Sequence, residues 1–199
     1  MNAAPLLNPF SLFFASIFTS NILLANFLGM CSFISISKDM KSSNGLGLAV
    51  TVVLTLTTAL NWIILNFVLI PLQVEYLRYI VFIISIAAVV QMLEMIIDRV
   101  SQALYMSLGI FLPLITVNCA ILGVSLFMEI RSYTFLQTVI YGFGSGLGWW
   151  LAIMALSAIR KKTEKAPIPA GLKGPGITVI TIGFMAMAFI GFSGMLQVQ

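Results

Sequence analysis

The sequence contains no histidine, only two cysteines and few charged residues, and each shortage excludes a class of protein or site. Without histidine there is no imidazole to ligate haem, a Rieske centre or a histidine–zinc site. Cys31 and Cys119 form no CxxC motif and lie in apolar runs, which argues against an exported structural disulfide. Charged residues make up 8% of the chain, against about 25% in a typical soluble domain. A soluble enzyme is therefore excluded.

The residues that are present are mostly apolar and occur in long runs. Hydrophobic residues make up 60% of the 199 positions, and the mean hydropathy is +1.09. Runs of about 20 apolar residues can cross a bilayer as helices, and these runs are continuous rather than alternating, which favours helices over a barrel. The sequence predicts an all-α membrane protein with a single integral domain, residues 1–199. The N-terminus lacks the basic region and cleavage site of a signal peptide.

Six transmembrane helices are predicted from the apolar runs. Only the connection between the fifth and sixth is long, and its Pro, Gly and Lys content is typical of a solvated loop. In chain order the predicted spans are Phe10–Ser37, Leu46–Ile70, Leu77–Ile97, Ala103–Met128, Phe135–Ile159 and Ile177–Leu196.

Basic residues are distributed unevenly among the connections. The connections after spans one, three and five hold eight Lys and Arg residues, whereas those after spans two and four hold only Arg78 and Arg131. The positive-inside rule places the richer set in the cytoplasm and both termini outside. The net charge of +4 is therefore a signal of membrane orientation, and not of nucleic-acid binding. The eight residues are Lys38, Lys41, Arg99, Arg160, Lys161, Lys162, Lys165 and Lys173.

Six spans divide into two sets of three, residues 10–98 and 103–197. Because three is odd, a repeat of this unit must be inverted across the membrane. A shift of 88 residues lays Cys31 on Cys119 and Trp62 on Trp150, although little else matches. Inverted repeats are typical of proteins that bring discontinuous helices to the membrane midplane. We therefore predict two inverted three-helix repeats.

Each cysteine lies in the first span of its repeat, close to a helix breaker. Gly29 precedes Cys31, and Pro113 precedes Cys119. We predict that the first helix of each half is broken there. The freed backbone groups would find partners in the side chains of Asn26 and Asn118, and the two thiols would face each other near mid-depth.

Two interpretations of these cysteines follow from the residues. They are either small buried apolar side chains or thiolate ligands of a soft metal. Iron–sulfur clusters usually take four cysteines, so two would make half a site. A second chain, or a second copy of this one, would then supply the rest.

Four stretches of the chain resemble a known family of membrane subunits: "FLGMCSF", "LGIFLPLITVNCAILG", "YGFGSGLGWWLAI" and "GITVITIGFMAMAFIGFSG". This family is shared by the Na+-translocating NADH:quinone reductase and the Rnf ferredoxin:NAD+ reductase. The resemblance covers essentially the whole chain. "LGMCSF" and "GFGSGLGWW" are more similar to the E-type quinone-reductase members, with the A-type Rnf members as the alternative.

The resemblance implies a subunit without a complete active site, belonging to a six-subunit complex of the bacterial inner membrane. Such a subunit pairs with a homologous D-type subunit of opposite orientation. Cys31 and Cys119 would then be two of four thiolates that hold a shared iron centre, a [2Fe–2S] cluster. The cluster relays electrons between flavins on other subunits, and sodium transport is coupled to that flow.

Three further interpretations are made from the residues. The glycines of "GFGSGLG" allow close helix packing, and the threonines of span two bond within their own helix. No covalent flavin is expected, because "LTLTTAL" lacks the small Gly- or Ser-containing surroundings of the family's flavin-attachment motif. A small-solute or ion carrier, which inverted repeats also suit, and a structural scaffold stay open as alternative functions.

Overall fold

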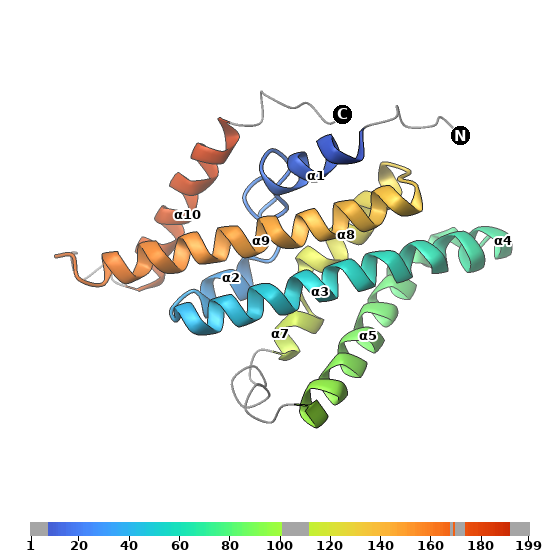
Figure 1. Cartoon of the computed structure of the whole chain (residues 1–199), viewed down its shortest axis with the longest axis horizontal. Coiled ribbons are helices and arrows are strands. Elements are labelled where there is room, and N and C mark those ends of the chain that lie inside the picture. The colour runs from blue at the N-terminus through green and yellow to red at the C-terminus, as the bar shows by residue number, and fades with distance from the viewer. Residues whose placement is uncertain (1–7, 101–111, 168, 170–173, 192–199) are drawn as a thin grey trace.

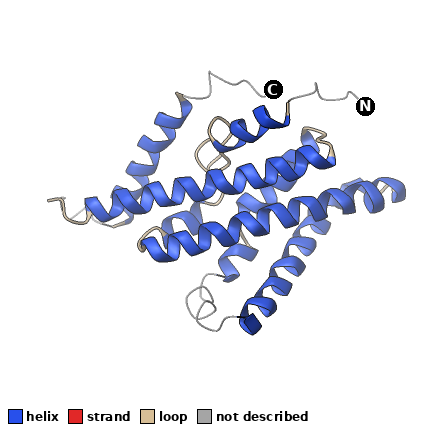
Figure 2. Ribbon diagram, viewed as in Figure 1, coloured by secondary structure: helices blue, strands red, loops and turns tan. Residues whose placement is uncertain are grey.

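A computed structural model describes residues 8–100, 112–167, 169 and 174–191. Figure 2 shows helices and loops, and no strand, throughout this part of the chain. In chain order the helices are α1 (Pro9–Ile17), α2 (Met30–Ile36), α3 (Met40–Ile64), the π-helix η1 (Leu65–Leu69), α4 (Ile70–Leu72), the 3₁₀-helix η2 (Glu75–Leu77), α5 (Arg78–Val100), α7 (Leu112–Thr116), α8 (Cys119–Ile130), α9 (Phe135–Thr163) and α10 (Pro175–Ile190).

The apolar helices confirm an all-α protein of membrane character. Three stretches are long and apolar enough to cross a bilayer: Met40–Leu72, Glu75–Ile96 and Phe135–Thr163. Two shorter apolar helices cover Leu114–Ile130 and Pro175–Ile190. The six-span count stays a prediction, and the predicted segments 103–111 and 192–196 lie outside the described residues.

Helix boundaries differ from the predicted spans where polar caps extend the helices. α3 begins six residues early because Asp39 caps it, its carboxylate accepting a hydrogen bond from the Ser42 N–H at 3.0 Å. α9 continues to Thr163 and carries basic residues, including Arg160, in its last turn. Positive charge there is favourable against the partial negative charge of the helix end.

Helices α3 and α9 pack antiparallel at the centre, with α5 and α10 on opposite flanks (Figure 1). Glycines on one face of α9 allow the close approach. A Cβ at Gly146 would lie 2.7 Å from the Cα of Thr51, and Gly142 faces Thr58 in the same way. Later residues of α9 therefore meet earlier residues of α3.

The other two glycines of the motif face α1. Gly144 lies against Ser16, and a Cβ at Gly148 would be 2.9 Å from the Ile17 carbonyl oxygen. Glycines four residues apart thus share a face, and the two faces contact two different helices. The packing interpretation of "GFGSGLG" is confirmed within this single chain.

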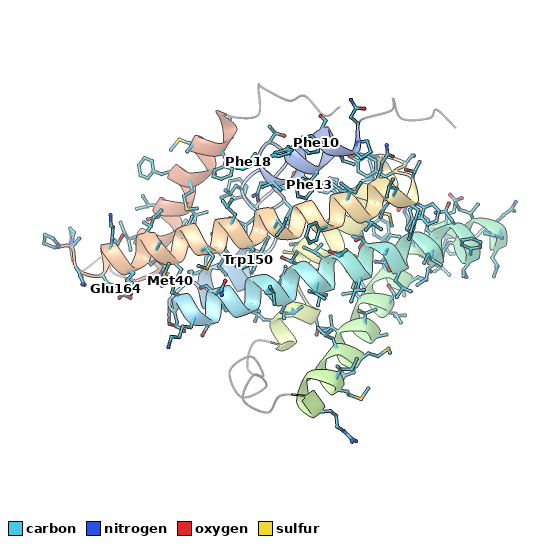
Figure 3. The ribbon with its side chains drawn as sticks, viewed as in Figure 1. Phe10, Phe13, Phe18, Met40, Trp150 and Glu164 are labelled. Carbon is cyan, nitrogen blue, oxygen red and sulfur yellow. The ribbon has the colours of Figure 1, made fainter. Side chains whose placement is uncertain are left out.

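Two tryptophans tie the ends of the central pair together. Trp62, near the end of α3, donates its indole N–H to the carbonyl of Tyr133 just before α9, at 2.9 Å. Trp150, in α9 (Figure 3), donates its N–H to Oδ1 of Asn44 in the first turns of α3, at 3.1 Å. Each indole reaches the start of the other helix, so the contacts are reciprocal.

Basic residues at the end of α2 and the start of α3 lie near the end of α9. Arg160 donates to the Ile34 carbonyl at 2.9 Å and to Ser37 Oγ at 2.6 Å, which joins α9 to the end of α2. At the other end of the central helices Arg78 forms an ion pair with Glu129. Lys38 and Lys41 therefore gather with Arg160, far from Arg78.

The threonines of α3 bond to their own helix, as predicted. The hydroxyls of Thr51, Thr55 and Thr58 donate to carbonyls one turn earlier at 2.8, 2.8 and 2.6 Å. The donors of these hydroxyls are therefore satisfied within the helix.

Candidate functional site

The first cysteine segment is interrupted between α1 and α2, over residues 18–29. Asn21, which is buried, satisfies the backbone at this interruption. Its Oδ1 accepts hydrogen bonds from the N–H groups of Leu23 and Leu24 at 3.0 and 3.4 Å. Its Nδ2 donates to the carbonyls of Ile17 and Gly148, both at 2.9 Å.

The role predicted for Asn26 is therefore wrong. Asn26 is exposed, and its side chain makes no hydrogen bond to another described residue. Asn21 lies at the point where α1 ends, so its amide reaches the backbone groups that the helix leaves open. A signal was present in the sequence: Asn21, like Asn118, precedes a run of apolar residues that begins a new turn.

Gly29 ends this interruption in a left-handed conformation, with φ of 87°, and α2 follows. An L-residue with a side chain is strained there. The space is also filled, because an added Cβ would lie 2.9 Å from Nε1 of Trp149 and 3.1 Å from Oδ1 of Asn118. Gly29 is therefore required by both conformation and packing.

The second cysteine segment is interrupted between α7 and α8, at residues 117–118. Pro113 lies within α7, and the interruption that the structure describes comes about one turn later. The residues directly before α7, where a break at Pro113 would begin, lie outside the described residues. Asn118 makes the interruption and begins the next helix. Its N–H donates to the Ile115 carbonyl at 3.2 Å, and its Oδ1 accepts from the Ala120 N–H at 3.0 Å, which caps α8.

The two interruptions pack against each other, although they lie 90 residues apart in the chain. The backbone N–H of Gly29 donates to Sγ of Cys119 at 2.9 Å. Nδ2 of Asn118 donates to Oγ of Ser32 at 3.3 Å, one residue beyond Cys31. The fold thus brings the two predicted ligand segments to one place.

Both cysteines are free thiols, in different surroundings. Cys119 is half-buried and is the first residue of α8, whereas Cys31 is exposed in the first turn of α2. The interpretation of both as buried apolar side chains is therefore wrong for Cys31. A crevice of about 390 Å³ opens beside Cys119, and its apolar walls include Ile83, Ile86, Val117 and Leu122.

The chemistry of the site fits half of a cysteine-ligated metal centre. Within the described residues no three His, Cys, Asp or Glu side chains come close enough to hold a metal ion together. The sulfur of Cys119 nevertheless accepts a backbone N–H, as the sulfur ligands of iron–sulfur centres commonly do. The surroundings of Gly29 leave no room for a side chain, and its backbone, at the start of α2, lies against that sulfur.

The amino-acid sequence matches a family model described as "Rnf-Nqr subunit, membrane protein" over residues 9–196. The chain belongs to the Rnf-Nqr family. Similar proteins include the E-type subunits of the Na(+)-translocating NADH-quinone reductases of Proteus mirabilis and Yersinia enterocolitica, 52% and 53% identical over 190 residues. Both alignments cover 92% of this chain and 96% of the relative. The resemblance predicted from the motifs is confirmed.

Proposed function

We propose that this member of the Rnf-Nqr family is the E-type membrane subunit of a Na+-translocating NADH:quinone reductase. Relatives over 50% identical along nearly their whole length bear that name, and the described helices suit a membrane subunit. The chain would contribute to sodium export as part of the complex, without a complete active site of its own.

Electron relay is proposed to depend on Cys31 and Cys119 as ligands of an iron–sulfur centre, of the [2Fe–2S] type. When bound, such a centre accepts and donates single electrons. The observation that carries this proposal is the hydrogen bond from Gly29 to the sulfur of Cys119, which joins the two cysteine segments. The backbone of one segment would stabilise negative charge on the thiolate of the other.

A homologous D-type subunit of opposite orientation is proposed to complete the centre with its own two thiolates. Cys31, Asn26 and Phe27 are all exposed on this chain, beside a backbone interruption. Exposed polar groups at membrane depth are costly in lipid, and a partner subunit would cover them. The reciprocal contacts of Trp62 and Trp150, equivalent positions in the two halves, support the proposed inverted repeat.

We place the chain in the bacterial inner membrane with both termini in the periplasm. The basic connections would then lie in the cytoplasm, together with the end of α9. Reporter fusions after Gln199 and within the connection from α9 to α10 test this orientation. A cytoplasmic C-terminus would overturn it.

Iron and acid-labile sulfide analysis of the purified complex tests the ligand role. Cys31→Ser and Cys119→Ser should each lose the centre while the complex still assembles, because a serine hydroxyl is a poor ligand for a soft metal site. Ser35→Ala, an exposed change on the same helix as Cys31, is the matched control and should keep full iron content. Full iron in a cysteine variant would remove that residue from the ligand set.

Sharing of the centre is tested by expressing the chain with and without its partner. Alone, the chain should bind little iron and tend to aggregate, and the pair should hold one centre. A full centre in the monodisperse single subunit would contradict the shared arrangement.

A further inference from the structure

A pocket of about 300 Å³ opens between the end of α9 and the start of α10, which is the lower end of the size range of ligand sites. Arg160, Thr163 and Glu164 line it from one side, and Ile177 and Thr178 line it from the other. Both threonine hydroxyls donate to carbonyls of their own helices, at 2.8 and 3.0 Å. Their protons are therefore in use, and Arg160 is the side chain of this group that can donate to a ligand.

Arg160 is held in place by the end of α2. Its Nη1 donates to the Ile34 carbonyl at 2.9 Å and to Ser37 Oγ at 2.6 Å. A guanidinium has five N–H donors, and among the described residues its other two nitrogens make no hydrogen bond. Within the same residues Arg160 also has no carboxylate partner. It therefore presents an unpaired charge and free donors in a fixed position, and phosphate is a group that guanidinium binds with two parallel hydrogen bonds.

The charges around the pocket favour an anion. The last turn of α9 carries Lys161 and Lys162 as well as Arg160, and Lys165 follows shortly after. Glu164, at the end of α9 (Figure 3), is the one acidic residue in residues 160–165. Four basic residues therefore outweigh one carboxylate, which opposes the anion and lowers its affinity.

An apolar stripe runs along α10 away from the pocket. Ile177 in the pocket wall, Ile180, Phe184 and Met187 follow helical spacing and share one face. The last three are exposed, whereas Thr178, Ile182, Met185 and Ala186 on the other face are buried. A ligand that fills both regions has an anionic head and an apolar tail.

We propose that this pocket binds a phospholipid with an anionic headgroup. Its phosphate lies on Arg160, and an acyl chain lies along the stripe of Ile180, Phe184 and Met187. Basic residues at a membrane surface attract anionic lipids, and an arginine already fixed by α2 loses little freedom on binding. The lipid would join the end of α9 to α10. The site is separate from the cysteine segments and does not depend on the iron–sulfur centre.

Photocrosslinking in the purified complex tests the proposal. p-Benzoylphenylalanine replaces Ile180, the complex is placed in nanodiscs of equal amounts of phosphatidylglycerol and phosphatidylcholine, and the lipid adducts are identified by mass spectrometry. The same amino acid at Ile84, exposed in the middle of α5, reports the bulk lipid. The ratio of phosphatidylglycerol to phosphatidylcholine adducts should be about fivefold higher at position 180, the factor expected for one basic residue at the surface.

Three variants locate the selectivity. Arg160→Gln should return the ratio at position 180 to that at position 84. Arg99→Gln, which removes the same charge from the last turn of α5, is the matched control and should keep the higher ratio. Glu164→Gln removes the opposing carboxylate and should raise the ratio further. This variant leaves the contacts of Arg160 with α2 intact, so it also decides the outcome if Arg160→Gln fails to assemble.

Equal ratios at positions 180 and 84, or adducts of position 180 with a peptide of another subunit, would overturn the lipid site. An unchanged ratio in Glu164→Gln would also overturn it. Cys119→Ser should lose iron and keep the lipid ratio, so the lipid site and the proposed centre are tested separately.

Discussion

Both interruptions must supply hydrogen-bond partners for the backbone groups that a broken helix leaves open, but they differ in length. The first extends over residues 18–29 and uses left-handed backbone at Phe27 and Gly29. The second is confined to residues 117–118, and one asparagine both closes the turn and caps the next helix. The longer interruption leaves more N–H and C=O groups without helical partners than the shorter one.

The difference decides which segment depends on the rest of the chain. Asn118 satisfies the second interruption mainly with its own neighbours. The first interruption borrows partners from the second half, since Asn21 donates to the Gly148 carbonyl and Gly29 donates to Cys119. The conformation of the first cysteine segment therefore depends on contacts with the second half of the chain. Substitutions in it should destabilise the subunit more than those in the second segment.

The largest expected effect is at the end of the first interruption. Gly29→Ala forces a side chain into left-handed backbone and against Trp149 and Asn118. Strain of about 1–2 kcal/mol from the backbone and about 1–3 kcal/mol from overpacking should add to a loss of about 3 kcal/mol. Heating the purified complex and following this subunit by size-exclusion chromatography measures the loss.

Gly183→Ala provides the control for that measurement. Gly183 lies inside α10, and nothing lies within 4 Å of the position of an added Cβ. Alanine there should be neutral or slightly stabilising. Equal stability of the two variants would show that the junction does not need Gly29.

Asn21 and Asn26 provide a second way to separate structural from exposed amides. Asn21→Ala removes four hydrogen bonds from buried backbone groups and should destabilise the subunit by about 2 kcal/mol. Asn26→Ala should leave the stability of the subunit itself unchanged, because the side chain is exposed. Thermal unfolding of both variants measures the two losses of stability. A larger loss with Asn26→Ala than with Asn21→Ala would contradict the structural role of Asn21.

A smaller effect is expected at the second interruption. Asn118→Ala removes the cap of α8 and should cost about 1 kcal/mol, whereas Asn118→Ser should keep most of the stability, because serine caps well. Hydrogen exchange of the first turn of α8 is the measurement. If serine exchanges as fast as alanine, the contact from Asn118 to Ser32 matters more than the cap.

The smallest effect concerns the caps of α3 and α9, the two long helices that come after the cysteine segments. α3 is capped by the carboxylate of Asp39, whereas α9 is capped by Thr134 with Gln137, which carry no charge. Hydrogen bonds from the Ser42 hydroxyl and backbone lower the pKa of Asp39 below its usual 3.8.

A lowered pKa means that the Asp39 cap stabilises α3 fully above about pH 4 and loses this contribution as the pH falls through the lowered value. Acid should therefore lower the protection factors, the exchange rates corrected for their intrinsic pH dependence, at the start of α3 and not at the start of α9. Asp39→Ser should abolish the difference between the two helices. A pH-independent start of α3 in the wild type would show that the cap is not used.

The sequence predicted that helices near Cys31 and Cys119 would be broken, because glycine, proline and asparagine gather there. It could not predict which groups complete each break. Asn21 and Asn26 are the same residue type, and only the path of the chain after Ile17 places one inside and the other outside. Pro113 does not mark the interruption at residues 117–118, because proline also begins helices.

The contact between Gly29 and Cys119 also could not be predicted from the sequence, because it depends on how α3 and α9 orient the two halves. The glycines of α9 were assigned correctly to packing. That two of them face α3 and two face α1 followed only from the structure.

The separation of contacts along the chain has a consequence for biosynthesis. The carbonyl that accepts from Trp62 is synthesised 71 residues after it. The sulfur that accepts from the Gly29 N–H is synthesised 90 residues after Gly29. Trp150 meets no such delay, because Asn44 has already been synthesised when Trp150 leaves the ribosome. During insertion the N-terminal half is therefore a nascent chain with open hydrogen-bonding groups in lipid. The moment of greatest need for an insertase or chaperone falls before the segment with Cys119 is made.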